Sequence, residues 1–116
     1  MADHKVLFHV SDNEIWPGVL ANITNFLKDV GPQEAEVEVV VNSAAVNTFY
    51  QTEEKKEILA RMAELNDVGV VFKACRNSLR SFDLDEGQRP NFVEVIPAGI
   101  TELVKKQADG FGYIRP

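Results

Sequence analysis

Short apolar segments of strand length recur along this chain, and helical patterns separate most of them. The segments are rich in β-branched residues, and several are apolar at consecutive positions, which is typical of strands buried on both faces of a parallel sheet. They lie at Lys5–Val10, Ala35–Val41, Val68–Phe72, Val93–Ile96 and Phe111–Ile114. This alternation predicts an α/β fold, a single three-layer domain with a mainly parallel, roughly five-stranded sheet.

The helices are expected at Trp16–Val30, Thr52–Asn66 and Ile100–Ala108, where apolar residues recur at three- and four-residue spacing. Thr52 has the character of an N-cap, because two acids that suit the helix dipole follow it. The segment from Asn42 to Tyr50 is expected to be a loop. The strands near Val6, Val39 and Val70 are apolar on both faces, so we expect them at the centre of the sheet.

The composition limits the classes of function. The chain has 116 residues, the size of one domain, and we treat residues 1–116 as that domain. Its net charge of −6 argues against a sequence-independent nucleic-acid binder. No leader and no membrane-spanning apolar run is present, and the single cysteine cannot form an internal disulfide, so a reducing cytoplasm is the expected location. Neither zinc-ligand spacing nor a Gly-rich phosphate loop occurs, and no metal or cofactor is expected.

Polar side chains follow three of the predicted strands, at the edge where parallel strands end and ligands gather. We expect these candidate ligand-binding residues to lie together there: Ser11, Asp12, Asn42, Ser43, Asn47, Arg76, Asn77 and Ser78. The alternative is that Ser, Asn and Asp only cap helices and turns. A cysteine in the third group, Cys75, favours the functional interpretation.

Cys75 is the candidate nucleophile, because it stands where a buried strand gives way to a helix. A thiol at a helix N-terminus meets unpaired N–H groups that favour the thiolate, and Arg76 adds positive charge, so we expect a lowered pKa. Burial would act in the opposite direction. We expect partial exposure in a crevice shared with Ser11 and Asn42. A cysteine hydrolase would need His9 as its base, which is the weaker interpretation.

Three parts of the chain carry a resemblance to a known family: Ala74-Cys75 with Asn77-Ser78-Leu79, the step Val95-Ile-Pro-Ala-Gly99, and the closing run Gln107–Pro116. Over nearly its whole length the chain resembles the DsrE/DsrF-like family. The resemblance implies a flavodoxin-like α/β layer that assembles into homo-oligomers, trimers or hexamers. It also implies a part in sulfur relay, with Cys75 at the position of a cysteine that accepts a sulfane sulfur and passes it to a partner protein.

Two functions of different class follow. The first is a sulfurtransferase-like persulfide carrier that uses Cys75, which needs only one accessible thiolate. The second is an oligomeric module that binds a small ligand or anion without catalysis, and a scaffold without chemistry is a third alternative. Self-association is expected in each case, because five apolar residues outside the regular patterns would expose a patch on a monomer. These are Val46, Phe49, Tyr50, Phe82 and Phe92.

Overall fold

The computed structural model describes residues 3–116 and contains one sheet in which every neighbouring pair of strands is parallel. The strands are β1 (His4–Val10), β2 (Ala35–Val41), β3 (Val71–Cys75), β4 (Val93–Ile96) and β5 (Gly112–Ile114). The α-helices are α1 (Trp16–Val30), α2 (Lys56–Asp67), α3 (Arg76–Ser81) and α4 (Gly99–Ala108). Three 3₁₀ segments join them: η1 (Pro32–Glu34), η2 (Ser43–Tyr50) and η3 (Glu86–Gln88). The predicted α/β fold with a five-stranded parallel sheet is confirmed.

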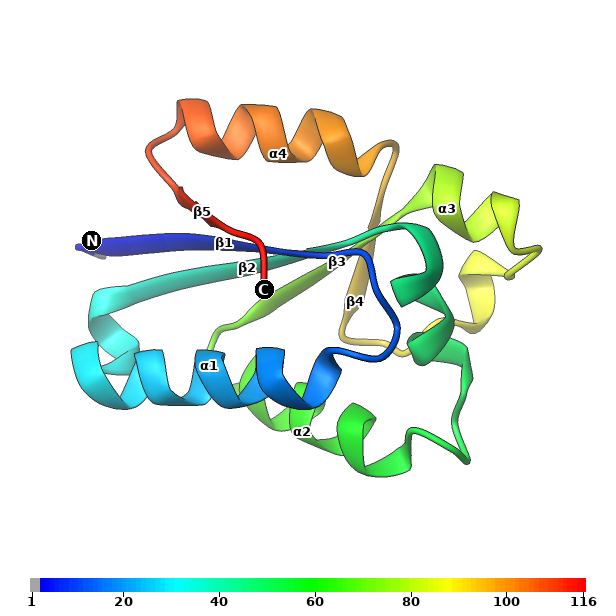
Figure 1. The fold of residues 1–116 in the computed structure, drawn as a ribbon, viewed down its shortest axis with the longest axis horizontal. Helices are drawn as coiled ribbons and strands as arrows, with labels where there is room; N and C mark the ends of the chain where they lie inside the picture. Colours follow the sequence, from blue (N-terminus) through cyan, green and yellow to red (C-terminus); the bar gives the residue numbers. More distant parts are fainter. Residues whose placement is uncertain (1–2) are drawn as a thin grey trace.

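The strand order is β4-β3-β2-β1-β5, so the chain steps from β1 to β4 in one direction across the sheet. Helix α4 then carries it back to β5, which pairs with the other side of β1 (Figure 1). Right-handed crossovers in opposite directions place their helices on opposite faces. The predicted central position of the first three strands is confirmed, since β4 and β5 are the edges.

The two faces of the sheet are covered unequally. Helices α1 and α2 lie on one face and α4 lies on the other, while α3 lies beyond the end of β3 (Figure 1). The large core under α1 and α2 includes Trp16, Phe49 and Phe72. The core under α4 is much smaller, with Leu7, Val40, Leu103 and Phe111 as its buried members.

Three expected boundaries are wrong. The third strand, expected at Val68–Phe72, runs from Val71 to Cys75, because Val68 is the C-cap residue of α2 and Gly69 has a φ of 104°. Helix α2 begins at Lys56, and Thr52 is not its N-cap. The residues before it carry three charges and offer no apolar side chain to anchor a helix on the sheet; the inward stripe begins only at Ile58. Residues 43–50, expected as a loop, form η2 instead, because Ala45, Val46 and Phe49 are buried against the core.

The expected apolar patch is also largely wrong. Val46 and Phe49 are fully buried, and Tyr50 and Phe92 are half-buried against the same core. Of the five residues only Phe82 is exposed, at 43%. Val46, Phe49 and Tyr50 cover the core beyond the end of β2, and Phe92 covers it before the start of β4. Linear patterns do not separate this role from an exposed patch.

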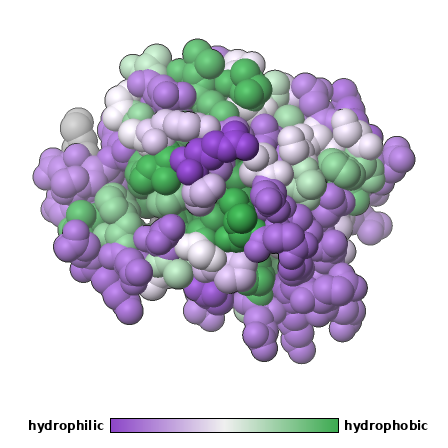
Figure 2. Space-filling view, in the orientation of Figure 1, coloured by the Kyte–Doolittle hydropathy of each residue, from purple (hydrophilic) through white to green (hydrophobic). Residues whose placement is uncertain are grey.

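A different apolar surface lies on α4. Ile100 and Val104, one helical turn apart, are 64% and 63% exposed. Figure 2 shows hydrophobic side chains gathered at the top of the molecule, over α4, with others near the middle of this face. None of the helices within residues 3–116 is long and apolar enough to cross a membrane.

Candidate functional site

The sulfur of Cys75 lies where two helices begin. Cys75 is the last residue of β3 and the N-cap residue of α3, as the sequence predicts. The first residue of α4, Gly99, packs against it from the neighbouring connection: a Cβ added to Gly99 would stand 3.5 Å from the Cβ of Cys75 and 3.4 Å from that of Asn42. Because this approach covers the thiol, Cys75 is only 6% exposed, and the expectation of partial exposure is wrong.

Several hydrogen-bond donors surround this sulfur. Burial raises the pKa of the Cys75 thiol, but the Ser78 hydroxyl and the amides of Gly99, Ser78 and Asn77 together outweigh burial and hold the pKa below its ordinary value. Sulfur is a weak acceptor, and the Cys75 side chain makes no cap hydrogen bond to α3. The site therefore favours a buried thiolate through N–H groups of both α3 and α4.

Ser78 ties the thiol to the end of β2. Its hydroxyl oxygen accepts a hydrogen bond from the amide of Ser43 at 2.8 Å, while its own proton is free to face the sulfur. Ser43 has a φ of 52°, in the left-handed region that non-glycine residues seldom adopt. Such a conformation costs on the order of 1 kcal/mol and persists only where the surrounding structure holds it. The fold therefore holds the Ser43 amide in place for its contact with Ser78.

Asn42 lies beside Gly99, next to Cys75, and its side chain contacts His9. Its Oδ1 atom lies 3.1 Å from Nε2 of His9, and Nδ1 of His9 lies 2.6 Å from the hydroxyl oxygen of Tyr113. A neutral ring that donates to Asn42 and accepts from Tyr113 satisfies both contacts. Burial lowers the pKa of His9, the hydrogen bond with Asn42 opposes this, and Arg115 lowers the pKa further. Both ring nitrogens are thus engaged, which disfavours His9 as the free base of a cysteine hydrolase.

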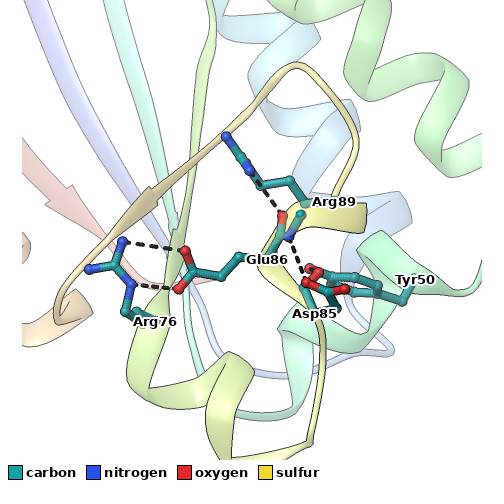
Figure 3. A network of polar contacts seen from close by, with 6 residues as sticks. Tyr50, Arg76, Asp85, Glu86 and Arg89 are labelled. Carbon is teal, nitrogen blue, oxygen red and sulfur yellow. Dashed lines mark hydrogen bonds and ion pairs between the residues drawn. The ribbon is translucent and has the colours of Figure 1, made fainter.

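Arg76 does not take the expected position near the thiol. Its Nε lies 2.5 Å from Oε2 of Glu86, and Figure 3 shows the guanidinium turned toward that carboxylate, with Arg89 and Tyr50 in the same network. The ion pair raises the pKa of Arg76 and lowers that of Glu86. Arg76 therefore fastens α3 to η3, and the donors that lower the thiol pKa are those of Asn77, Ser78 and Gly99.

The remaining predicted residues lie apart from the sulfur or serve local structure. Ser11 accepts a hydrogen bond from Nη2 of Arg115 at 3.1 Å, at the end of β1. Asp12 accepts from the amide of Glu14, and Asn47 donates to the carbonyl of Ala44, so both stabilise their own turns. The structure thus brings Asn42, Ser43, Asn77 and Ser78 around Cys75, and it leaves Ser11, Asp12, Asn47 and Arg76 out of its immediate contacts.

Gly99, Tyr113 and Arg115 were not expected in the site. A signal for Gly99 exists, because it follows the fourth strand at the edge where Cys75 follows the third, and a residue without a side chain allows close approach. Tyr113 and Arg115 had no such signal, since their place depends on β5 pairing beside β1. Within residues 3–116 no group of three or more His, Cys, Asp or Glu side chains is placed to hold a metal ion.

Comparisons with known proteins agree with this architecture. The sequence pattern of the DsrE/DsrF-like family matches residues 7–116. A solved structure described as a protein of unknown function, MTH1491 from Methanobacterium thermoautotrophicum, has a TM-score of 0.85 and 31% sequence identity. That match covers 98% of this chain and 100% of the other. No curated protein matches the sequence significantly. Because the family match spans nearly the whole chain, this protein belongs to the DsrE/DsrF-like family.

Proposed function

We propose that this protein is a sulfur-relay protein that carries a persulfide on Cys75. Membership of the DsrE/DsrF-like family suggests a sulfur-relay-related role. The observation that carries the finer proposal is the set of donors around one buried sulfur, which together hold the thiol pKa below its ordinary value despite burial. A residue that only filled space in the core would have its thiol pKa raised by burial.

The proposed step is an exchange between sulfur atoms. The Cys75 thiolate attacks the terminal sulfur of a donor persulfide, and its electron pair forms the new S–S bond. The S–S bond of the donor breaks, its electron pair leaves with the donor sulfur as a thiolate, and the proton of the sulfane sulfur stays with it on Cys75. No net oxidation occurs. The reverse exchange with an acceptor thiol regenerates the Cys75 thiolate, so a donor and an acceptor protein are the partners in this proposal.

Access to the sulfur requires a local opening, because the thiol is 6% exposed. Helix α3 has six residues, and α4 buries only Gly99 and Leu103, so both are weakly anchored elements. Segments with few buried contacts open at lower free energy than the core. We infer that a donor reaches Cys75 when the first turn of α4 moves away from the end of β3.

Intact-mass analysis after incubation with a small-molecule persulfide donor tests this function. The wild-type chain should gain the mass of one sulfur atom, and a reductant should remove it. The Cys75→Ser variant should gain none, and it is a matched control because it keeps a small polar side chain there. A wild-type chain that remains unmodified while folded and fully reduced would overturn the carrier proposal.

The burial of Cys75 favours a second candidate, the oligomeric module that binds a small anion without catalysis. Arg115 and Ser11 lie at the end of β1, where the strand order reverses and ligands commonly bind in α/β sheets. Thiosulfate is the probe, because it presents anionic oxygens as well as a sulfane sulfur. Binding by calorimetry that Arg115→Gln abolishes, together with no persulfide on Cys75, would favour this function.

A further inference from the structure

Four charged residues lie between the sheet and α4, beneath the smaller of the two covering layers. Lys73 of β3 places its Nζ 3.1 Å from Oε1 of Glu38 and 2.8 Å from Oε2 of Glu102, and Lys106 lies 3.6 Å from the same oxygen of Glu38. The side chains of Lys73, Glu38 and Glu102 are 16%, 6% and 14% exposed. We call these four residues the α4 charge cluster. Burying so much charge is costly unless it is closely paired, so their arrangement needs an explanation.

The α4 charge cluster and the thiol lie next to each other, and both lie between β3 and α4. On β3, Lys73 and Cys75 are two residues apart and so lie on one face of the strand. On α4, Glu102 and Gly99 are three residues apart and so lie on one face of the helix. Lys73 contacts Glu102, and Gly99 packs against Cys75, where its amide lowers the thiol pKa. The ion pair therefore lies about one helical turn from the place where Gly99 packs against Cys75.

Few other side chains hold the first turn of α4 against the sheet. Leu103 is the one large apolar side chain that α4 buries within the described chain, and no side chain caps the helix start at Ala98. Ile100 and Val104 point into solvent. A helix held by one leucine depends on its polar contacts for its exact position.

We propose that the contact of Lys73 with Glu102, supported by Glu38, positions the amide of Gly99 against the sulfur of Cys75. Lys73 and Glu102 are positioning residues in this inference, which rests on the proposed function of Cys75 as a thiolate. Loss of the contact lets the first turn of α4 move and removes one of the donors that favour the thiolate.

The sign of the effect separates positioning from simple electrostatics. Removing the negative charge of Glu102 favours a nearby thiolate by Coulomb interaction and would lower the thiol pKa. Loss of the Gly99 amide as a donor would instead raise the thiol pKa. A rise in the thiol pKa after removal of an acid is therefore a readout that charge alone does not produce.

The experiment measures the alkylation rate of Cys75 by iodoacetamide against pH in folded, reduced protein. Glu102→Met should move the midpoint of the pH profile to higher pH, because the Gly99 donor is lost; the limiting rate at high pH reports access and is compared separately. Glu102→Gln keeps an oxygen that accepts from Lys73, so it should retain the wild-type midpoint. Glu94→Gln is the matched control: Glu94 lies opposite Lys73 on β4, is exposed, and forms none of the ion pairs found within residues 3–116.

A second variant covers the case in which Glu102→Met does not fold. Glu38→Leu with Lys73→Met removes the anchor from the sheet side, leaves the net charge unchanged and fills the space with apolar groups, which proteins often tolerate. It should raise the midpoint in the same way. Folded variants of both designs with the wild-type midpoint would overturn the positioning role. A wild-type midpoint at or above that of free cysteine would instead overturn the proposed function, whatever the variants show.

Discussion

The hydroxyl oxygen of Ser78 accepts a hydrogen bond from the amide of Ser43 at 2.8 Å, and the same hydroxyl, three residues after Cys75, lowers the pKa of the cysteine thiol. A single side chain thus joins the end of β2, the start of α3 and the thiol. Among the four donors that lower the thiol pKa, this hydroxyl makes the largest contribution.

Replacing Ser78 by Ala should therefore make the thiol less acidic. The alkylation rate of Cys75 below neutral pH should fall several-fold, because the hydroxyl donor is lost while burial is unchanged. The amide of Ser43 also loses its partner, which should lower the free energy of unfolding by about 1 kcal/mol. Ser81→Ala is the control, since that hydroxyl bonds only to the carbonyl of Asn77 on the same helix. An unchanged alkylation profile in Ser78→Ala would contradict this assignment.

Gly99→Ala should separate access to the thiol from its acidity. The new Cβ would stand at ordinary contact distance, 3.4–3.5 Å, from Asn42, Cys75 and Val40, so the variant should fold with a stability within about 1 kcal/mol of wild type. It should slow alkylation at every pH by covering the sulfur, with an unchanged midpoint because the amide donor remains. Rates equal to wild type would show that the Gly99 approach does not limit access.

Glu38 should make the stability of the fold depend on pH. Burial, where a charged carboxylate is poorly solvated, and a hydrogen bond with Glu102 together raise its pKa from 4.5 to about 7, against the opposing effect of Lys73. Between pH 4.5 and about 7, Glu38 is therefore protonated in the folded state and deprotonated in the unfolded state. The free energy of unfolding should therefore fall as pH rises from 4.5 to 7, by up to about 3 kcal/mol.

Chemical denaturation of wild type and Glu38→Gln across pH 5–8 checks this slope. Glutamine mimics the protonated acid, since it accepts from Lys73 and donates to Glu102, and it does not titrate. The difference between the two proteins should increase with pH in favour of the variant. His9, whose pKa burial lowers, gives stability that falls below pH 6.5, but it is common to both proteins and leaves the difference unaffected. A constant difference would contradict the raised pKa of Glu38.

The fold followed from the sequence because its determinants are local. Runs such as Val37–Val41 are apolar at both faces of the strand or nearly so, and α1 has a continuous apolar stripe that ends at Gly31, whose φ is 90°. Right-handed crossovers then allow few arrangements. Thr52 was misplaced because capping preference is a small term, about 1 kcal/mol, and the absence of an apolar anchor outweighed it.

The site was predictable only in part. The place of Cys75 at a strand end followed from pattern, and so did its approach to the start of α3. Its burial did not, because Gly99 lies 24 residues later in the chain and no local pattern records that the two meet. The predicted role of Arg76 was wrong for a similar reason. Its guanidinium pairs with Glu86, ten residues later in the chain, and the sequence alone does not single out this partner.

Self-association is proposed through α4 and β5 in place of the patch first expected. Ile100 and Val104 are 64% and 63% exposed, and Tyr113 and Ile114 of edge strand β5 are 41% and 42% exposed. Exposed apolar residues at such density on a small protein commonly mark an interface.

Sedimentation should show a homo-oligomer, a trimer or hexamer as the family resemblance implies. Ile100→Lys with Val104→Lys should shift it toward monomer at micromolar concentration, because each buried lysine charge opposes association. Val68→Lys is the control, since Val68 is 52% exposed but follows α2, which lies on the other face of the sheet. A wild-type chain that sediments as a monomer, or a double variant that keeps the wild-type assembly, would show that this surface is not the interface.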